Sequence, residues 1–558
     1  MRKDKRKKKK NKRLLIIIAI LLIVVVSIFI VLNVAVKNVY GDKTQIIINN
    51  NNVTLKLKNP AYVNDKEVVY ISIADVKNFL DNYIYVDNEN SQIITTFDEK
   101  IGVLSTKENI ININNTNVNL FSGVETKDNQ TYIPLSLMSN VYNMEINFIK
   151  DKKILVMDSL DRELVKMDAS SNLKVKEKKT GFSRIVGKVK KGEKIILIDS
   201  KDGWSKIRTQ SGIIGYVKSS KLQNKVIVRQ KLEKKAQIEG KVNMVWDYFS
   251  EYAKAPNRNG TQIEGVNVVS PAFFSVIKNG EGKLNANVGD KGKSYIAWAN
   301  QNNYKVWAMV SNNSYKDTIS QILNSYKLRT NLINNIVYAA TAYNIDGINI
   351  DFENLKKEDR EVFSRFIIEL KPKLKEAGKV LSVDVTAVDG GDDWSECYDR
   401  TTISNVADYI VFMAYDQYSV NSKKAGTTAG YNWIETNIKK FIDREEVKSE
   451  KILLGIPFYT RLWEEKNGEI VSNKTIDMKD INKTLPQNIQ KTWKDDIKQN
   501  YVEYENKGSI YKMWIEDEES LKAKIGLVKQ YNLAGIGSWE KDREESSIWS
   551  VINKALNN

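Results

Sequence analysis

Polar side chains recur at every second position near the end of the segment Asp346-Gly-Ile-Asn-Ile-Asp-Phe-Glu353. Side chains alternate between the two faces of a strand, so Asn349, Asp351 and Glu353 are predicted to share one face. The opposite face is wholly apolar and suits packing under helices. Because burying charges is costly, this arrangement indicates a catalytic strand rather than a structural one. The alternative is an exposed strand edge or helix start that carries acids by chance.

The composition narrows the chemistry that these acids could perform. The 558 residues include no histidine and one cysteine, Cys397, so no intrachain disulfide can form. The lack of histidine excludes Ser-His-Asp and Cys-His catalysis and argues against a transition-metal site. Acid–base catalysis would therefore have to use Asp, Glu, Tyr or Lys. We predict neither a metal nor a cofactor.

Positive charge is concentrated at the N-terminus. The net charge is +17, but the first 13 residues hold ten Lys or Arg and one Asp, and the remainder carries +8. A mildly basic body suits an anionic wall polymer as its partner. Nucleic acid is the alternative partner of a basic protein. No basic–aromatic recognition motif is present, so we predict no nucleic-acid binding.

An uncharged segment, residues 14–36, follows the basic tail of residues 1–13. As a helix its 23 residues would span about 34 Å, enough for a bilayer core. A cleavable signal peptide has a shorter apolar core and a small-residue cleavage site, and this segment ends in a poor one. We predict an uncleaved transmembrane anchor in the cell membrane, with a cytoplasmic tail and everything after Lys37 outside, facing the wall. A cleaved signal peptide is the alternative.

Residues 45–160 contain an internal repeat. The pattern around Tyr70 returns 62 residues later around Tyr132, and each copy continues through a short helical stretch into alternating strands. This small α+β module resembles the copper amine oxidase N-terminal-like domain of wall-associated bacterial proteins. Without His or paired Cys, copper binding is not expected. We expect a spacer or wall-binding module; a plain structural stalk is the alternative.

Residues 168–224 hold five strand-length segments separated by glycine-containing turns, which predicts a small all-β barrel. The pairs Gly203-Trp204 and Gly215-Tyr216-Val217 resemble those of a bacterial SH3 domain. The resemblance implies binding of peptidoglycan peptides, with a pure spacer as the alternative. Residues 225–236 are predicted to form a linker.

Apolar strands alternate with helical stretches in residues 237–558, which indicates a parallel α/β fold. One helix is predicted between Val362 and Leu374, where apolar residues recur every four positions before Gly378. Eight strand–helix units fit a (β/α)8 TIM barrel. The gap of about 75 residues before the last strand predicts an inserted α+β subdomain. The eight candidate strands are residues 242–248, 266–270, 305–310, 347–353, 380–386, 409–415, 452–458 and 534–539.

Motifs at four of these strand ends resemble glycoside hydrolase family 18, in particular its spore cortical-fragment-lytic branch. The segment ending in Glu353 resembles the family's DxxDxDxE signature on strand four. Met413-Ala-Tyr415-Asp416 resembles the strand-six motif, Gly455-Ile-Pro-Phe-Tyr459-Thr-Arg461 the strand-seven segment, and Gly537-Ser-Trp539 the strand-eight tryptophan. The resemblance covers residues 237–558 and implies a hydrolase of N-acetylglucosaminyl bonds.

The resemblance also implies roles for three catalytic residues. The N-acetyl carbonyl of the substrate attacks the anomeric carbon, and configuration is retained. Glu353 would protonate the leaving oxygen and then activate water, which requires a raised pKa. Asp351 would accept the acetamido N–H, and Tyr415 would bind the acetamido oxygen.

Seven further residues are predicted to bind substrate. Trp539 would stack on the sugar, with barrel packing as the alternative, and Arg461 has a structural ion pair as its alternative. Asn349 stands where the family has aspartate; it can hydrogen-bond Asp351 but cannot take its proton, which affects the rate and the pH profile. The predicted substrate-binding residues are Asp346, Asn349, Met413, Asp416, Tyr459, Arg461 and Trp539.

Together these features predict a membrane-anchored extracellular hydrolase that cuts cell-wall peptidoglycan at N-acetylglucosamine. Two alternatives stay open. The first is a chitinase-like hydrolase of chitin or exopolysaccharide. The second is a catalytically weak glycan-binding wall or sporulation protein built on the same barrel.

Overall fold

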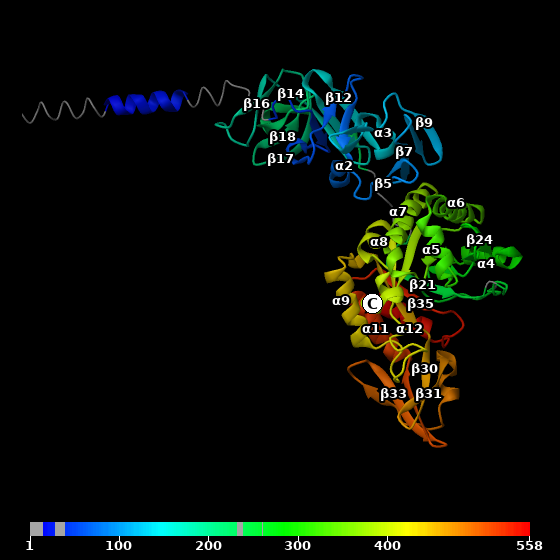
Figure 1. The fold of residues 1–558 in the computed structure, drawn as a ribbon. Coiled ribbons are helices and arrows are strands. Elements are labelled where there is room, and N and C mark those ends of the chain that lie inside the picture. The colour runs from blue at the N-terminus through cyan, green and yellow to red at the C-terminus, as the bar shows by residue number, and fades with distance from the viewer. Residues whose placement is uncertain (1–14, 28–39, 232–237, 251, 259, 558) are drawn as a thin grey trace, which may run out of the picture. The chain divides into compact units, whose positions relative to one another are not determined.

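A computed structural model describes residues 15–27, 40–231, 238–250, 252–258 and 260–557 (Figure 1). The chain divides into two compact units, Met1–Lys234 and Lys235–Asn558.

Of the predicted anchor, residues 15–27 are helical. Its other residues, 14 and 28–36, and the basic tail at 1–13 lie outside the described residues. None of the helices in the described part of the chain has the length and apolar character needed to cross a bilayer.

The first unit begins with an α+β module, as predicted. The two copies of its repeat meet directly: β4 (Val69–Ser72) and β11 (Gln130–Ile133) pair antiparallel, and Tyr62 packs on both Tyr70 and Tyr132. A second sheet joins the two ends of the module, because β1 (Gln45–Ile48) pairs in parallel with β13 (Ile154–Ser159). The other elements are β2 (Asn51–Asn52), β3 (Tyr62–Val63), α2 (Ile73–Phe79), β5 (Tyr85–Asp87), β6 (Gln92–Phe97), β7 (Lys100–Ser105), β8 (Ile110–Ile113), β9 (Thr116–Asn119), β10 (Glu125–Lys127), α3 (Ser139–Tyr142) and β12 (Met144–Ile149).

A seven-stranded sheet follows, in the order β16-β15-β19-β18-β17-β14-β20. The five predicted strands are present, but the predicted linker is wrong over residues 225–229. These residues continue β20, which pairs antiparallel with β14 and contains the β-branched run Val226-Ile-Val228. Residues 232–236 of that linker lie outside the described residues. The strands are β14 (Leu164–Ala169), β15 (Leu173–Lys176), β16 (Ile185–Val189), β17 (Lys194–Lys201), β18 (Trp204–Arg208), β19 (Ile214–Lys218) and β20 (Leu222–Arg229).

The α+β module and the seven-stranded module pack tightly against each other. Arg208 of β18 donates two hydrogen bonds to the carboxylate of Asp158 in β13, at 2.8 and 2.5 Å, and both side chains are buried. Ile214 of β19 packs on an apolar cluster that includes Ile47 and Ile154. A buried charge needs its partner, so this contact fixes the two modules to each other.

The second unit is a closed barrel of eight parallel strands, at the eight predicted positions. Each strand pairs in parallel with its neighbours, and β35 closes the ring by pairing with β21. The predicted TIM barrel is therefore confirmed. The strands are β21 (Val242–Asp247), β22 (Val268–Pro271), β25 (Lys305–Ser311), β26 (Gly347–Asp351), β27 (Val380–Val385), β28 (Tyr409–Met413), β29 (Ile452–Pro457) and β35 (Gly535–Trp539).

Alternation along the strands separates the outside of the barrel from its lumen. In β26, Ile348 and Ile350 are fully buried in the apolar cluster that includes residues of the helices, while Asn349 and Asp351 face the lumen. The predicted helix is α7 (Arg360–Glu376), and Gly378 follows it with a left-handed φ of 70°. The other main helices are α4 (Gly289–Gln301), α5 (Lys316–Asn324), α6 (Tyr326–Ala342), α8 (Arg400–Val406), α9 (Tyr431–Lys439), α11 (Glu518–Gln530) and α12 (Ile548–Asn557).

The predicted insertion lies between β29 and α11 and forms a sheet of its own (Figure 1). Its antiparallel order is β31-β30-β34-β33-β32, with the short helix α10 (Ile481–Thr484) beside it. The last strand leads into α11, where fully buried Lys524 pairs with fully buried Glu516 at 2.6 Å. The strands are β30 (Tyr459–Lys466), β31 (Glu469–Asp477), β32 (Thr492–Lys494), β33 (Gln499–Asn506) and β34 (Ser509–Ile515).

Candidate active site

The candidate catalytic acids lie at the C-terminal end of β26. The strand ends at Asp351, two residues earlier than predicted, so Glu353 lies on the loop that follows. Asn312, just beyond β25, holds this loop: its side chain accepts from the backbone N–H of Glu353 at 3.1 Å and donates to its carbonyl at 2.8 Å. Glu353 is thus positioned by a neighbouring strand end rather than by its own strand.

Two of the predicted catalytic groups, Asp351 and Glu353, have raised pKa values. Burial raises the pKa of Asp351 well above its usual value, and the charges of Glu353 and Asp384 raise it further. Burial also raises the pKa of Glu353, with a further contribution from Asp416. A carboxyl group that is shielded from water and lies near another carboxylate retains its proton to higher pH than an isolated, exposed one does. The pair can therefore offer one acid and one hydrogen-bond acceptor at the same time.

Asn349 lies deeper in the lumen and is fully buried. Its Oδ1 accepts from Trp246 Nε1 at 2.9 Å, and its Nδ2 donates to Asp384 Oδ1 at 2.7 Å. Ser270 and Ser382 complete its hydrogen bonds. The structure corrects two predictions: Asn349 bonds Asp384 instead of Asp351, and it is closed off from a substrate.

Asp384 is a site residue that the sequence reasoning missed. It is 1% exposed and projects from β27 into the same cluster of acids. Burial raises its pKa well above the usual value, while the bond from Asn349 opposes that shift. The signal was an acid between valines in the strand Val380-Leu-Ser-Val-Asp-Val385, on the face opposite those valines.

Aromatic side chains, here called the aromatic wall, lie beside the acids; they are Tyr415, Trp539, Trp246 and Tyr248. Tyr415, 8% exposed, lies two residues beyond β28, and its ring stacks on Trp539 with centroids 6.4 Å apart. Trp539, at the end of β35, also contacts Trp246 edge to face and the exposed ring of Tyr248. Trp539 is only partly buried, so it packs in the barrel and still presents surface. Met413, 5% exposed, ends β28 below this wall.

Asp416 accepts hydrogen bonds from both residues that were predicted on the strand-seven segment. Tyr459 donates its hydroxyl to Asp416 Oδ1 at 2.8 Å, and Arg461 donates Nη2 to the same oxygen at 3.0 Å. The backbone of Asp416 is left-handed, with φ of 56°. Arg461 therefore forms the ion pair given as its alternative, and its partner Asp416 is the residue whose charge raises the pKa of Glu353.

Asp346 does not belong to this group. It precedes β26, at the opposite end of the strand from Asp351. Its carboxylate accepts from Lys305 Nζ at 3.1 Å and from the backbone N–H of Val306 at 3.0 Å. The prediction that Asp346 binds substrate is wrong, because the first acid of the motif anchors the N-terminal end of the strand pair.

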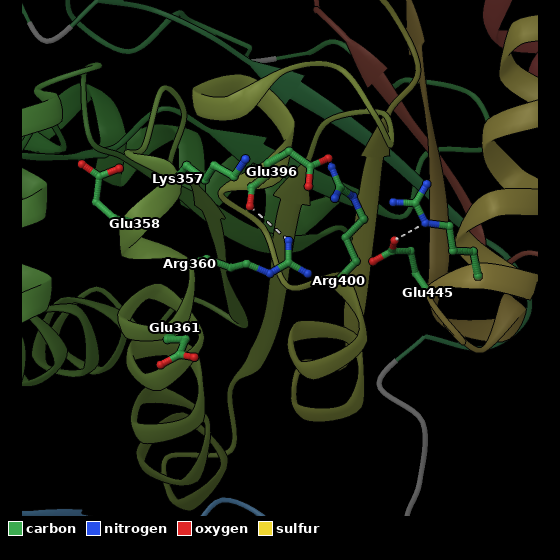
Figure 2. A pocket seen from close by; sticks show the side chains of 8 residues that line it. Lys357, Glu358, Arg360, Glu361, Glu396, Arg400 and Glu445 are labelled. Carbon is green, nitrogen blue, oxygen red and sulfur yellow. Dashed lines mark hydrogen bonds and ion pairs between the residues drawn. The ribbon is translucent and has the colours of Figure 1, made fainter.

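Figure 2 shows a separate charged pocket of about 360 Å³, which contains none of the predicted site residues. Arg400 donates to the carbonyl of Thr386 at 3.0 Å, and Arg360 donates to the carbonyl of Glu396 at 3.1 Å. These two arginines are bound to neighbouring backbone, and Lys357 and Arg444 pair with carboxylates, so most of the positive charge here has a structural role. The lining residues are Lys357, Glu358, Arg360, Glu361, Glu396, Arg400, Arg444 and Glu445.

A parallel barrel with a cluster of acids at one strand end and an aromatic wall beside it defines a glycosidase-type site. Residues 244–544 match the family model of glycosyl hydrolases family 18, and the chain belongs to this family of glycoside hydrolases. Residues 171–223 match the bacterial SH3 domain, and residues 47–157 match the copper amine oxidase N-terminal domain. All three resemblances noted in the sequence are confirmed.

Similar proteins include bacterial glycosylases. An uncharacterized glycosylase, YvbX of Bacillus subtilis, is 29% identical over 307 residues, covering 52% of this chain and 84% of that protein. The cortical fragment-lytic enzyme of B. subtilis is 25% identical over 262 residues, covering 44% of this chain and 58% of that enzyme. A chitinase from Chromobacterium violaceum shares the fold, with a TM-score of 0.50, 23% identity and coverage of 57% of this chain and 100% of that one.

Proposed function

We propose that the barrel hydrolyses N-acetylglucosaminyl bonds of cell-wall peptidoglycan with retention of configuration. The observation that carries this proposal is the pair Asp351 and Glu353. Both have raised pKa values, and they lie beside Tyr415 and Trp539 at one end of the barrel. The pair can hold one proton and one negative charge together, as substrate-assisted hydrolysis requires.

In the first step, the proton of Glu353 passes to the glycosidic oxygen as the bond from that oxygen to the anomeric carbon breaks. The acetamido carbonyl oxygen of the substrate forms the new bond to that carbon. Asp351 accepts the acetamido N–H and stabilises the positive charge of the oxazolinium, while the Tyr415 hydroxyl donates to the acetamido oxygen. In the second step, Glu353 takes a proton from water, water attacks the anomeric carbon, and the acetamide is restored.

Peptidoglycan is preferred over chitin in this proposal for two reasons. One relative is named a cortical fragment-lytic enzyme, and this chain also carries a bacterial SH3 domain. A linked wall-binding module would raise the local concentration of glycan at the barrel. N-acetylglucosamine would occupy the position beside Trp539, and the bulkier N-acetylmuramic acid would lie on the leaving-group side.

Digestion of purified walls tests the substrate. Soluble residues 38–558 are incubated with purified peptidoglycan and, in parallel, with chitin oligomers, and the products are identified by mass spectrometry after borohydride reduction. We expect fragments with reducing N-acetylglucosamine ends from peptidoglycan. Rapid cleavage of chitin oligomers with inert peptidoglycan would instead support the chitinase-like alternative. Binding to both without products would support a glycan-binding protein.

We also propose that residues 14–36 anchor the chain in the cell membrane with the barrel outside. The support is the uncharged run after a tail of ten Lys or Arg. Protease added to intact cells should release a soluble fragment that begins after Lys37. A barrel that is degraded only after the membrane is lysed would contradict this orientation.

A further inference from the structure

The seven-stranded module carries most of the positive charge that lies outside the N-terminal tail. Residues 164–229 hold 17 Lys or Arg and five Asp or Glu, a net charge of +12. Residues 14–558 together carry +8, so the part of them outside this module has a net charge of −4. The basic character of the chain beyond its tail is therefore confined to one small module.

The sheet of this module has an outer face that is divided between two surroundings. The inner face, which includes Val175 and Val217, packs in the core of the module. On the outer face, Arg208 and Ile214 at one end of their strands pack on the α+β module. At the other end of the strands, the outward side chains are exposed to solvent or half-buried. The outer face is therefore part interface and part open surface.

Four lysines and one tryptophan, here called the lysine row, cross the open end of this face. Lys188 of β16 lies directly opposite Lys174 of β15. β15 also pairs antiparallel with β19, and two residues along from their paired residues, toward the same end, lie Lys174 and Lys218. Lys218 lies opposite Trp204 of β18, and Trp204 lies opposite Lys201 of β17. Neighbouring strands are about 4.8 Å apart, so a row across five strands spans about 19 Å.

The lysine row has too little negative charge of its own. None of its four lysines forms an ion pair within the part of the chain that the structure describes. Lys174 and Lys188 face each other directly, and like charges at opposite positions destabilise a sheet. Lys218 Nζ lies 4.2 Å from the centroid of the Trp204 ring, which offsets the cost of one ammonium group only in part. An anionic ligand would supply the missing counter-charges.

The acids beside the row do not neutralise it. Asp202, in the turn after Lys201, pairs with Lys179 at 2.6 Å. Asp199 lies opposite Lys206 on the neighbouring strand. Each of these acids is thus matched by a lysine outside the row, and the row stays positive.

We propose that the lysine row binds a linear polymer of phosphodiester-linked polyols. A row one residue wide and about 19 Å long fits an extended chain better than a small ligand or a flat lipid surface. Lysine ammonium groups bind phosphate as point charges and suit a repeating anion. A nucleic acid would also use aromatic rings to stack its bases, but the Trp204 ring is half-buried with Lys218 over it. The site is separate from the barrel and does not depend on the proposed hydrolysis.

Calorimetric titration of the full-length chain, purified in a non-ionic detergent, tests this site. The probe is synthetic poly(glycerol phosphate), and neutral dextran is the control. We expect the phosphate polymer to bind and dextran not to bind. The affinity should fall about tenfold or more between about 50 and 200 mM salt, because several phosphate contacts release counterions. No binding of the phosphate polymer, or equal binding of dextran, would overturn the proposal.

Two competitors distinguish other sources of phosphate. One is an oligothymidylate with the same number of charges, and the other is phosphatidylglycerol in mixed micelles of the same detergent. We expect both to bind more weakly than poly(glycerol phosphate) at equal phosphate concentration. Tighter binding of the oligothymidylate would assign the row to nucleic acid, and tighter binding of the lipid would assign it to a membrane surface. Either result would contradict the proposal.

A pair of triple variants with equal charge locates the binding site. The first variant replaces three lysines of the row by glutamine and should weaken binding of the polymer about tenfold or more, as expected for three exposed ionic contacts. The second removes the same charge from exposed lysines of the same module outside the row and should weaken binding about twofold or less. Equal losses would show general attraction to a basic module and refute the row. The substitutions are Lys174→Gln, Lys188→Gln and Lys218→Gln in the first variant, and Lys178→Gln, Lys194→Gln and Lys225→Gln in the second.

A single substitution separates lost binding from misfolding. Lys188→Gln removes the repulsion with Lys174, so the temperature of thermal unfolding should be unchanged or higher. The same variant should weaken binding of the polymer about two- to fourfold, the effect of one exposed ionic contact. A folded Lys188→Gln variant that binds the polymer as tightly as the unaltered chain would contradict the proposal.

Discussion

Asn349 donates from Nδ2 to Asp384 Oδ1 over 2.7 Å, one layer below Asp351 in the lumen of the barrel. The bond favours the ionised form of Asp384, whose pKa burial otherwise raises. The amide of Asn349, in the middle of the sequence motif on β26, thus forms a hydrogen bond with the Asp384 carboxylate on the neighbouring strand β27. Asp351 is left beside two acids, Glu353 and Asp384, whose charges raise its pKa.

The first prediction concerns the proton donor. Glu353→Gln keeps the size of the side chain but removes the transferable proton, so turnover should fall by about two to four orders of magnitude. Thermal unfolding should be unchanged, and Glu358→Gln, an exposed neighbour, is the matched control. Near-normal turnover in Glu353→Gln would exclude this residue as the acid. The first product from the unaltered enzyme should have the β configuration.

The second prediction concerns the acidic limb of the pH profile. The Asp384 charge raises the pKa of Asp351, which must be ionised to accept the acetamido N–H. Asp384→Asn removes that charge, lowers the pKa of Asp351 and should extend activity to lower pH. The profile of kcat/KM on a soluble substrate measures the limb. An acidic limb that stays in place, or moves to higher pH, would show that Asp384 does not act on Asp351.

The third prediction concerns the alkaline limb. Asp416 raises the pKa of Glu353, which must be protonated to act as the acid. Asp416→Asn removes a negative charge and leaves Arg461 without its ion pair, and both changes lower the pKa of Glu353. Activity should therefore be lost at lower pH than in the unaltered enzyme. Asp495→Asn, an exposed carboxyl in the insertion, should leave the alkaline limb unchanged.

The fourth prediction concerns stability at the junction of insertion and barrel. Lys524→Met leaves Glu516 buried without its partner and should lower the free energy of unfolding by about 3–5 kcal/mol. The double variant Lys524→Met with Glu516→Gln should recover most of that loss, because no isolated charge is left. Urea unfolding measures both. Lys522→Met, on the exposed face of α11, is the control and should differ little from the unaltered chain.

Much of the barrel was predictable because its strands are short apolar runs at regular spacing. The ends of those strands were less predictable. Glu353 lies beyond β26 because Asn312 from the neighbouring strand end binds its backbone, which is a contact between residues 41 apart. Asp346 belongs to the same sequence motif as Glu353, but the two residues lie at opposite ends of β26. The motif alone therefore did not distinguish a residue of the active site from one that holds the other end of the strand in place.

Contacts between strands also explain what was missed. Asp384 was visible as an acid in an apolar strand, but only the barrel places β27 next to β26 and brings it to Asn349. Residues 225–229 of β20 were missed because the part of β14 with which they pair, residues 164–166, lies outside the predicted SH3 boundary. In both cases the deciding partner is distant in the sequence, and local patterns do not identify it.

The buried pair of Arg208 and Asp158 has a consequence for the history of the chain. Modules that are joined only by flexible connections can be exchanged independently, because neither buries side chains of the other. Here a foreign SH3-type module without an arginine at this place would leave Asp158 uncompensated inside the contact. We therefore expect an exchange of one module alone to destabilise the first unit, whereas an exchange of both together would keep the pair intact.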